Sequence, residues 1–197
     1  MKKLIYLFLV ASIAWFVFLK NERVTLGPGL YAPDGPEQVM IENPESFPFE
    51  GYVITPLAGY EVRAKVLAKE NYYLGRESDL SPSDLALGWG NMSDERTLES
   101  IRIQQSSRWY HWYTDKLPIP GREIEQSSAN VHIIPADRMV ASTLKRVRSG
   151  DIVTLSGNLV RVDGRDGWKW VSSLSRKDTG AGSCELFFVD AMSIEDY

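Results

Sequence analysis

The sequence predicts a mainly β domain, a small β-barrel with one or two short helices, carried behind an N-terminal transmembrane helix. Three observations predict this fold: a charge-free apolar run at the N-terminus, short alternating stretches from residue 60 onward, and one stretch of helical periodicity in the second half. With 197 residues, of which 44% are hydrophobic and 24% charged, the chain is long enough for one folded domain. We expect a membrane anchor over 1–20, a Pro/Gly-rich tether over 21–50 and a β-barrel-like domain over 51–197.

The N-terminal run from Leu4 to Leu19 contains no charged residue and is flanked by lysines. Such a run is typical of a membrane-spanning or signal-anchor helix, and flanking lysines that snorkel compensate for its modest length. The alternative is a cleavable signal peptide, because Ser12 and Ala14 have the spacing that a signal peptidase prefers. Cleavage there would leave the apolar segment 15–19 exposed at a new N-terminus, which favours retention as an anchor.

The charges on either side of this run indicate its orientation. The amino terminus, Lys2 and Lys3 stand before it, and Lys20 and Arg23 follow it. This slight excess of positive charge on the first flank favours a cytoplasmic N-terminus. We therefore expect a single-pass protein of the cytoplasmic membrane, with its domain outside the cytoplasm.

The segment 21–50 holds five of the ten prolines and three glycines. Prolines lack the backbone donor that helices and sheets require, so this composition predicts a semi-extended tether and a folded domain that begins near Gly51. The first strand is expected over Tyr60–Tyr72, where apolar and charged residues alternate. Next, Ser81 can cap a short helix that runs through Leu87 and ends at the glycines on either side of Trp89.

The second half of the domain alternates strands with one clear helix. Strands are expected over 102–113 and 129–134, and Asp137 can cap a helix in which Val140, Leu144 and Val147 recur on one side until Gly150 ends it. A further strand is expected over 151–162, with a bulge at Gly157. A turn over 163–167 leads to a strand over 168–174, and 184–189 closes the domain.

Two resemblances accompany these patterns. The strand opening Gly150-Asp-Ile-Val-Thr-Leu-Ser-Gly157 resembles strands of OB-fold domains, which implies an OB-like barrel. The segments Ala86-Leu-Gly-Trp-Gly90, Ser128-Ala-Asn-Val-His132 and Ser173–Glu185 together resemble an uncharacterised group of membrane-anchored proteins of the bacterial envelope. This second resemblance implies the architecture and the location but no activity.

The charge of the domain excludes a common class of partner. When the three lysines of the anchor are left out, 19 of the 22 basic residues remain against 26 acidic ones, a net charge of −7. Nucleic acid is therefore not expected as a partner, because its binding depends on neutralising phosphates with cations. Cationic residues cluster only locally, most densely at Lys145, Arg146 and Arg148.

The stretch Arg108–Asp115 is unusually aromatic. On a strand, Trp109, His111 and Tyr113 share one face, while Tyr110 and Trp112 share the other. One interpretation is a stacking platform for sugar rings or nucleobases, as OB-like barrels provide. The other is that one face fills the barrel core and the other packs under the helix, because aromatic side chains bury large areas.

Residues suited to catalysis occur without a diagnostic spacing. Cys184 and His132 could form a thiolate and base pair, with Asn130 orienting the imidazole, but Cys184 enters a strand and is better explained as a structural thiol. His111 and His132 are the only histidines, and they lack the spacing of metal ligands, so no metal and no cofactor are expected. A metal site would need Asp84, Asp94, Asp115 or Asp178 to be brought in by the fold.

The polar loop Ser175–Ser183 has a composition that could hold an anion through backbone N–H groups, or it is a solvated connection. We expect an extracytoplasmic binding or interaction module without catalysis. The alternatives are an envelope hydrolase that uses Cys184 with His132 or a metal at the histidines, and a scaffold subunit of a membrane complex. No residue is assigned a catalytic role, and the candidate ligand-binding residues are Trp89, Arg108, Trp109, His111, Asn130, His132, Arg176 and Asp178.

Overall fold

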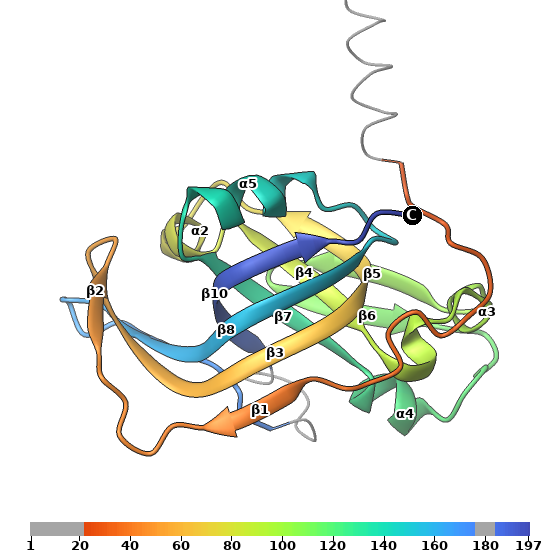
Figure 1. Cartoon of the computed structure of the whole chain (residues 1–197), viewed down its shortest axis with the longest axis horizontal. Coiled ribbons are helices and arrows are strands. Elements are labelled where there is room, and N and C mark those ends of the chain that lie inside the picture. Colours follow the sequence, from red (N-terminus) through yellow and green to blue (C-terminus); the bar gives the residue numbers. More distant parts are fainter. Residues whose placement is uncertain (1–21, 176–183) are drawn as a thin grey trace, which may run out of the picture.

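The computed structural model describes residues 22–175 and 184–197. Figure 1 shows strands wrapped around a central core, with α5 across one edge and α4 near the opposite edge. The helices and strands follow in the order β1 (Glu37–Met40), β2 (Phe47–Phe49), β3 (Tyr52–Asn71), α2 (Arg76–Leu80), β4 (Ser83–Gly88), η1 (Gly90–Ser93), α3 (Glu95–Leu98), β5 (Arg102–Ser106), β6 (Trp109–Tyr113), α4 (Gly121–Gln126), β7 (Ser128–Pro135), α5 (Arg138–Arg146), β8 (Ile152–Asp163), β9 (Lys169–Val171) and β10 (Glu185–Ile194).

Five strands close into a ring in the order β3, β4, β7, β10 and β8, because β8 pairs with both β10 and β3. Neighbours in the ring are antiparallel except β7 and β10, which are parallel. Strands β1 and β2 extend the sheet beside β3, and β9 extends it beside β8. The predicted mainly β fold is confirmed.

Helix α5 forms where the sequence predicts it. The Asp137 carboxylate accepts a hydrogen bond of 2.8 Å from the Val140 N–H, which caps the first turn. Val140 and Leu144 are buried and pack with apolar side chains of β3, β4, β7, β8 and β10 in the largest core cluster. The strands expected over 129–134 and 151–162 are confirmed in β7 and β8.

The predicted helix over Ser81–Leu87 is wrong, since this segment contains β4. Every residue of β4 is buried, and the strand is bonded on one side to β3 and on the other to β7. The serine, proline and aspartate at 81–84 fit a helix start, but central pairing satisfies the backbone on both sides and buries Leu85 and Leu87 in the core. Tertiary burial therefore overrides a local capping pattern.

The single strand predicted over 102–113 is also wrong, because the segment folds back on itself as β5 and β6. These strands form a separate antiparallel pair, with Arg102 opposite Tyr113 and Ser106 opposite Trp109. The turn between them consists of Ser107 and Arg108, whose φ angles are 52° and 69°. Tight hairpin turns of this kind usually hold asparagine or glycine, so no turn pattern marked this position.

The predicted tether over 21–50 is wrong for the part that the structure describes. Val24 N–H donates to the carbonyl oxygen of Ser149 at 2.8 Å, and the Ala32 carbonyl oxygen accepts from Gly90 N–H at 2.8 Å. The segment then adds β1 and β2 to β3, and Pro48 stands in β2, where an edge strand tolerates the missing donor. The folded domain therefore begins well before Gly51.

The predicted bulge at Gly157 lies on the opposite strand. The register of β10 against β8 shifts between Val189 and Ala191, directly across from Gly157. A Cβ atom on Gly157 would lie 2.1 Å from the Phe188 carbonyl oxygen, so the close approach of the two backbones requires glycine here. The closing strand expected at 184–189 is confirmed in β10, which continues to Ile194.

Within the described part of the chain, no helix has the length and apolar character needed to cross a bilayer. The predicted anchor over 1–20 lies outside the described residues.

Candidate functional site

The candidate site is built on the ribbon formed by β5 and β6. Exposure alternates strictly along both strands, so the ribbon has an outer and an inner face. The outer face carries Trp109, His111 and Tyr113, and Trp109 and Tyr113 are 38% and 50% exposed. Their cross-strand partners are all polar: Ser106, Gln104 and Arg102. Three aromatic rings thus stand in a row beside polar groups that can form hydrogen bonds.

The inner face of the ribbon packs against the domain. Ile103, Tyr110 and Trp112 contact a buried apolar cluster that includes Ala86 of β4. The Tyr110 hydroxyl lies 2.6 Å from the Ser128 hydroxyl, and burial raises the pKa of Tyr110 to about 12. Because Tyr110 stays neutral at ordinary pH and its hydroxyl is paired, it serves to hold the ribbon in place.

The tip of the ribbon is fastened by Arg108. Its guanidinium donates to Asp84 Oδ1 at 2.7 Å and to the Ser81 carbonyl oxygen at 2.9 Å, and it lies over the Tyr72 ring with 3.9 Å between Cζ and the ring centroid. The Arg108 backbone N–H donates to the Tyr72 hydroxyl at 2.9 Å. Its carbonyl oxygen accepts from the Asn130 side chain at 3.1 Å. The left-handed backbone at the tip is therefore held by contacts from β4, β7 and the β3–β4 connection.

A buried ionisable pair lies beneath Arg108. His132 and Asp84 are opposite each other on β7 and β4, with 3.0 Å between His132 Nδ1 and Asp84 Oδ1. At this distance His132 Nδ1 makes no hydrogen bond of acceptable angle, and Asp84 Oδ2 has no hydrogen-bond partner among the described residues. The His132 ring also packs on Trp170, with 5.0 Å between ring centroids. Asp84 is fully buried, so Arg108 supplies the main compensation for its charge.

Cys184 lies beside Asn130 and directly precedes β10. The Asn130 side-chain N–H₂ donates to the Cys184 sulfur at 3.8 Å, and the thiol donates to the Arg108 carbonyl oxygen at 3.8 Å. The oxygen of the Asn130 amide accepts from Gln105 at 2.6 Å. Asn130 therefore connects the Cys184 thiol to the ribbon. The prediction that Asn130 orients the His132 imidazole is wrong, because the side chain that lies against the imidazole is that of Asp84.

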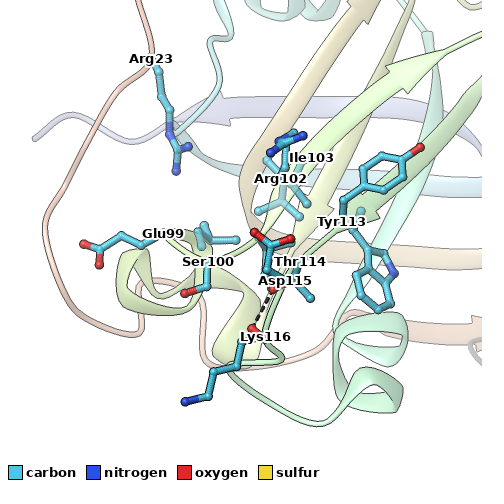
Figure 2. Close-up of a pocket in the computed structure, with 13 residues that line it drawn as sticks. Arg23, Glu99, Ser100, Arg102, Ile103, Tyr113, Thr114, Asp115 and Lys116 are labelled. Carbon is cyan, nitrogen blue, oxygen red and sulfur yellow. Dashed lines mark hydrogen bonds between the residues drawn. The ribbon is translucent and has the colours of Figure 1, made fainter.

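A cleft of about 1100 Å³ opens at the base of the ribbon. Figure 2 shows Tyr113 on one side and Glu99 on the other, with Arg102 and Asp115 between them. The Thr114 hydroxyl donates to the Lys116 carbonyl oxygen at 2.7 Å and orders the loop at the bottom of the view. Since Arg102 and Tyr113 belong to both the cleft and the aromatic row, the two form one continuous surface. The cleft is lined by Arg23, Leu67, Leu98, Glu99, Ser100, Ile101, Arg102, Ile103, Trp112, Tyr113, Thr114, Asp115 and Lys116.

The structure gathers some of the predicted site residues and separates others. Arg108, Asn130 and His132 meet beneath the ribbon, whereas Trp109 and His111 stand on its outer face. Trp89 is only 5% exposed and packs in the core of the ring, so it is not part of this surface. Arg176 and Asp178 lie outside the described residues.

Sequence reasoning did not assign Tyr72, Asp84 or Trp170 to the ligand site. Tyr72 and Trp170 contact the Arg108 guanidinium, at 3.9 Å and 5.7 Å from Cζ to the ring centroids, and Asp84 pairs with it. One signal was available, because Asp84 directly precedes the apolar run Leu85–Leu87, and a carboxylate in a buried strand needs a partner.

Among residues 22–175 and 184–197, no three acidic, histidine or cysteine side chains are arranged to hold a metal ion. No protein-family model, no curated protein and no solved structure matches this chain.

Proposed function

We propose that this chain is a membrane-anchored, extracytoplasmic binding module with an OB-like barrel, and that it holds oligosaccharides on the outer face of the β5–β6 ribbon without catalysis. The observation that carries the proposal is the row of exposed rings, Trp109, His111 and Tyr113, on a ribbon whose other face and tip are fastened to the domain. Exposed aromatic rings held rigidly in a row lose little conformational freedom when a flat ligand stacks on them.

The arrangement of the ring supports the OB-like part of the proposal. A ring of five strands with one parallel pair supports an OB-like barrel, and the ligands of OB-folds bind over the second and third strands. The corresponding strands here are β4 and β7, and the ribbon covers them through Arg108, Gln105 and Tyr110. In this chain the ligand surface is therefore the outer face of the ribbon, in place of the outer face of β4 and β7.

The charge distribution supports sugars over nucleic acid. Beyond Lys20 the chain has a net charge of −7, which opposes the approach of a polyphosphate. Along the aromatic row, Arg102, Gln104 and Ser106 supply hydrogen-bonding groups of the kind that fix sugar hydroxyls. The mixed charges of the adjoining cleft suit a polar ligand without a uniform charge.

Replacing Trp109 and Tyr113 together by alanine is expected to weaken oligosaccharide binding at least tenfold, since each stacked ring contributes about 1–3 kcal/mol. Binding is measured by tryptophan fluorescence and calorimetry with soluble N-acetylglucosamine oligomers, an acidic oligosaccharide and a thymidine oligonucleotide. Tyr73→Ala, which removes a tyrosine that is 84% exposed outside the ribbon, is the matched control. Equal affinities of the double variant and the control would refute the platform, and tight oligonucleotide binding would refute the ligand class.

A second function is favoured by one contact, the approach of Asp84 to His132 Nδ1. A carboxylate at this nitrogen leaves Nε2 for proton transfer, as in hydrolases that pair histidine with a nucleophile, and Cys184 directly precedes the neighbouring strand β10. This function requires a Cys184 thiolate at neutral pH.

The binding function predicts slow alkylation of Cys184 by iodoacetamide at neutral pH, at the rate of an ordinary partly buried thiol. It also predicts that Cys184→Ser changes oligosaccharide affinity less than twofold, because the thiol lies beneath the ribbon and does not touch its outer face. Rapid stoichiometric alkylation that His132→Gln abolishes would instead establish the hydrolase. Mass spectrometry of the alkylated protein measures the rate, and circular dichroism checks that each variant is folded.

A further inference from the structure

The start of the described chain lies against the domain, and this limits the distance between the domain and a membrane. Arg23 pairs with Glu95 at 2.9 Å, Val24 N–H bonds to the Ser149 carbonyl oxygen at 2.8 Å, and Gly29 N–H donates to Asp94 at 3.1 Å. Hydrogen bonds from Arg96 lower the pKa of Asp94 to about 2, so this carboxylate remains an acceptor at neutral pH.

Gly150 makes this attachment possible. Its φ angle is 92°, and a Cβ atom there would lie 1.8 Å from the Val24 carbonyl oxygen. Any other residue would displace the chain from this position. The segment is therefore fitted to the loop that follows α5.

The length of chain before this contact is short. The apolar run ends at Leu19, and five residues span at most about 18 Å even when fully extended. If Leu4–Leu19 is the anchor that the proposed function includes, Val24, which is hydrogen-bonded to Ser149, lies no farther than this from the end of the apolar run. The distance of tens of ångströms that a free tether over 21–50 would allow is excluded.

A basic groove lies at the same place. Lys145, Arg146 and Arg148 are exposed at its rim. The Lys69 amine is directed to the end of α5, where it donates to the Leu144 and Val147 carbonyl oxygens at 2.6 and 3.2 Å. Lys69 is therefore not counted among the cations that face solvent. The acidic side chains in the groove are Asp151, which accepts from the Arg148 backbone at 2.7 Å, and Asp196. Arg148 also forms a long ion pair of 3.4 Å with the other Asp151 oxygen, and the Arg146 guanidinium donates to Ser142 and Thr143 of its own helix. Among the described residues, Lys145 and Arg146 have no carboxylate partner.

From this placement we infer that the groove beside α5 docks on anionic phospholipid headgroups and fixes the orientation of the domain on the membrane. The inference rests on the proposed anchor. Each lysine or arginine near an anionic surface changes the ratio of docked to undocked domain by about fivefold, and this attraction extends over only about 8–10 Å. The attachment, at most about 18 Å long, allows Lys145, Arg146 and Arg148 to approach the surface to within this range.

The test uses the full chain in vesicles, with the domain outside, that contain either phosphatidylglycerol with phosphatidylcholine or phosphatidylcholine alone. A fluorophore is attached at Met139→Cys in a Cys184→Ser background, since Met139 lies on α5 and is 73% exposed. Lipids with a nitroxide on the headgroup quench it when α5 is close. Quenching is expected only in the anionic vesicles. Because Asp151 and Asp196 oppose the cations, a triple change of Lys145, Arg146 and Arg148 to glutamine is expected to lower the docked-to-undocked ratio on the order of tenfold to a hundredfold.

A control variant with Arg122, Arg165 and Lys169 changed to glutamine removes the same charge outside the groove and is expected to keep the quenching. If the groove variant does not fold, high salt applied to the unmodified groove gives the same comparison, because exposed charges are screened. Equal quenching in both kinds of vesicle, or equal effects of the two triple variants, would overturn the inference. Vesicle flotation in alkaline carbonate tests the anchor separately: a chain that washes off refutes the anchor and the docking together, and one that stays without quenching refutes the docking alone.

Discussion

Arg108→Met is expected to lower the free energy of unfolding by about 3 kcal/mol, the lower end of the range for a broken buried ion pair. The variant leaves the fully buried Asp84 carboxylate without its cation, and it removes the bond to Ser81 and the contact with Tyr72. The loss of stability stays at the lower end of that range because the Arg108 side chain is 19% exposed, and water partly screens its pair with Asp84. Urea unfolding followed by circular dichroism measures the change.

Two further variants separate the ion pair from the general loss of a side chain. Arg108→Lys keeps the charge but loses the planar fork that reaches Asp84 and Ser81 together, so an intermediate loss is expected. Adding Asp84→Asn to Arg108→Met removes the uncompensated charge and is expected to restore part of the stability. Arg102→Met, on the exposed face of the same ribbon, should change it by about 0.5 kcal/mol or less. If Arg108→Met lowers the free energy of unfolding no more than Arg102→Met does, Arg108 does not stabilise the buried Asp84 carboxylate.

The same variant connects stability to binding. The left-handed φ angles of Ser107 and Arg108 are unfavourable for residues with side chains, and the contacts of Arg108 with β4, β7 and the β3–β4 connection hold them. Without these contacts the tip of the ribbon is free to move, and the aromatic row that begins at Trp109 loses its fixed geometry. Oligosaccharide affinity should therefore fall in Arg108→Met even under conditions where the domain remains folded.

Local sequence pattern predicts the fold correctly where the burial of each residue in the structure agrees with the apolar and polar pattern of its segment. The apolar stripe of α5 and the cap at Asp137 describe a helix that lies on the ring, and β7 and β8 combine strand propensity with burial. Ser81–Asp84 shows the opposite case, since a helix-start pattern precedes a strand that is bonded on both sides. Nothing within those four residues reports that β3 and β7 will pair with the strand that follows.

The candidate site was predictable as a set of residues but not as an arrangement. The alternation of aromatic side chains correctly separates Trp109, His111 and Tyr113 from Tyr110 and Trp112. The turn at Ser107 and Arg108 lacks the usual glycine, so the sequence predicts one long strand and places Arg108 within it. The meeting of Arg108 with Asp84 and His132 depends on that turn and on strand pairing far apart in sequence, which no local pattern contains.

Lys65→Met is expected to destabilise the domain by about 3 kcal/mol and to release its N-terminal segment. Lys65 is fully buried in β3, with its Nζ 2.6 Å from Glu95 Oε1 and 5.1 Å from the centroid of the Tyr31 ring. The pair is close, but neither atom has a hydrogen bond of acceptable angle, so their attraction is mainly electrostatic. Without Lys65, the nearly buried Glu95 keeps only Arg23, whose side chain is half exposed.

The measurements are urea unfolding and limited proteolysis of the segment that precedes β1. Changing both partners, Lys65→Met with Glu95→Leu, should restore much of the stability, because a buried apolar pair can replace a buried ion pair at little cost. The proteolytic site should nevertheless remain open in that double variant, since Arg23 has then lost its acceptor. Arg161→Met removes an exposed pair with Asp163 and should change stability by about 0.5 kcal/mol or less. If Lys65→Met leaves both stability and proteolysis at the level of Arg161→Met, the Lys65–Glu95 pair does not hold the N-terminal segment on the domain. This pair would then not be what keeps the basic groove close to the apolar run.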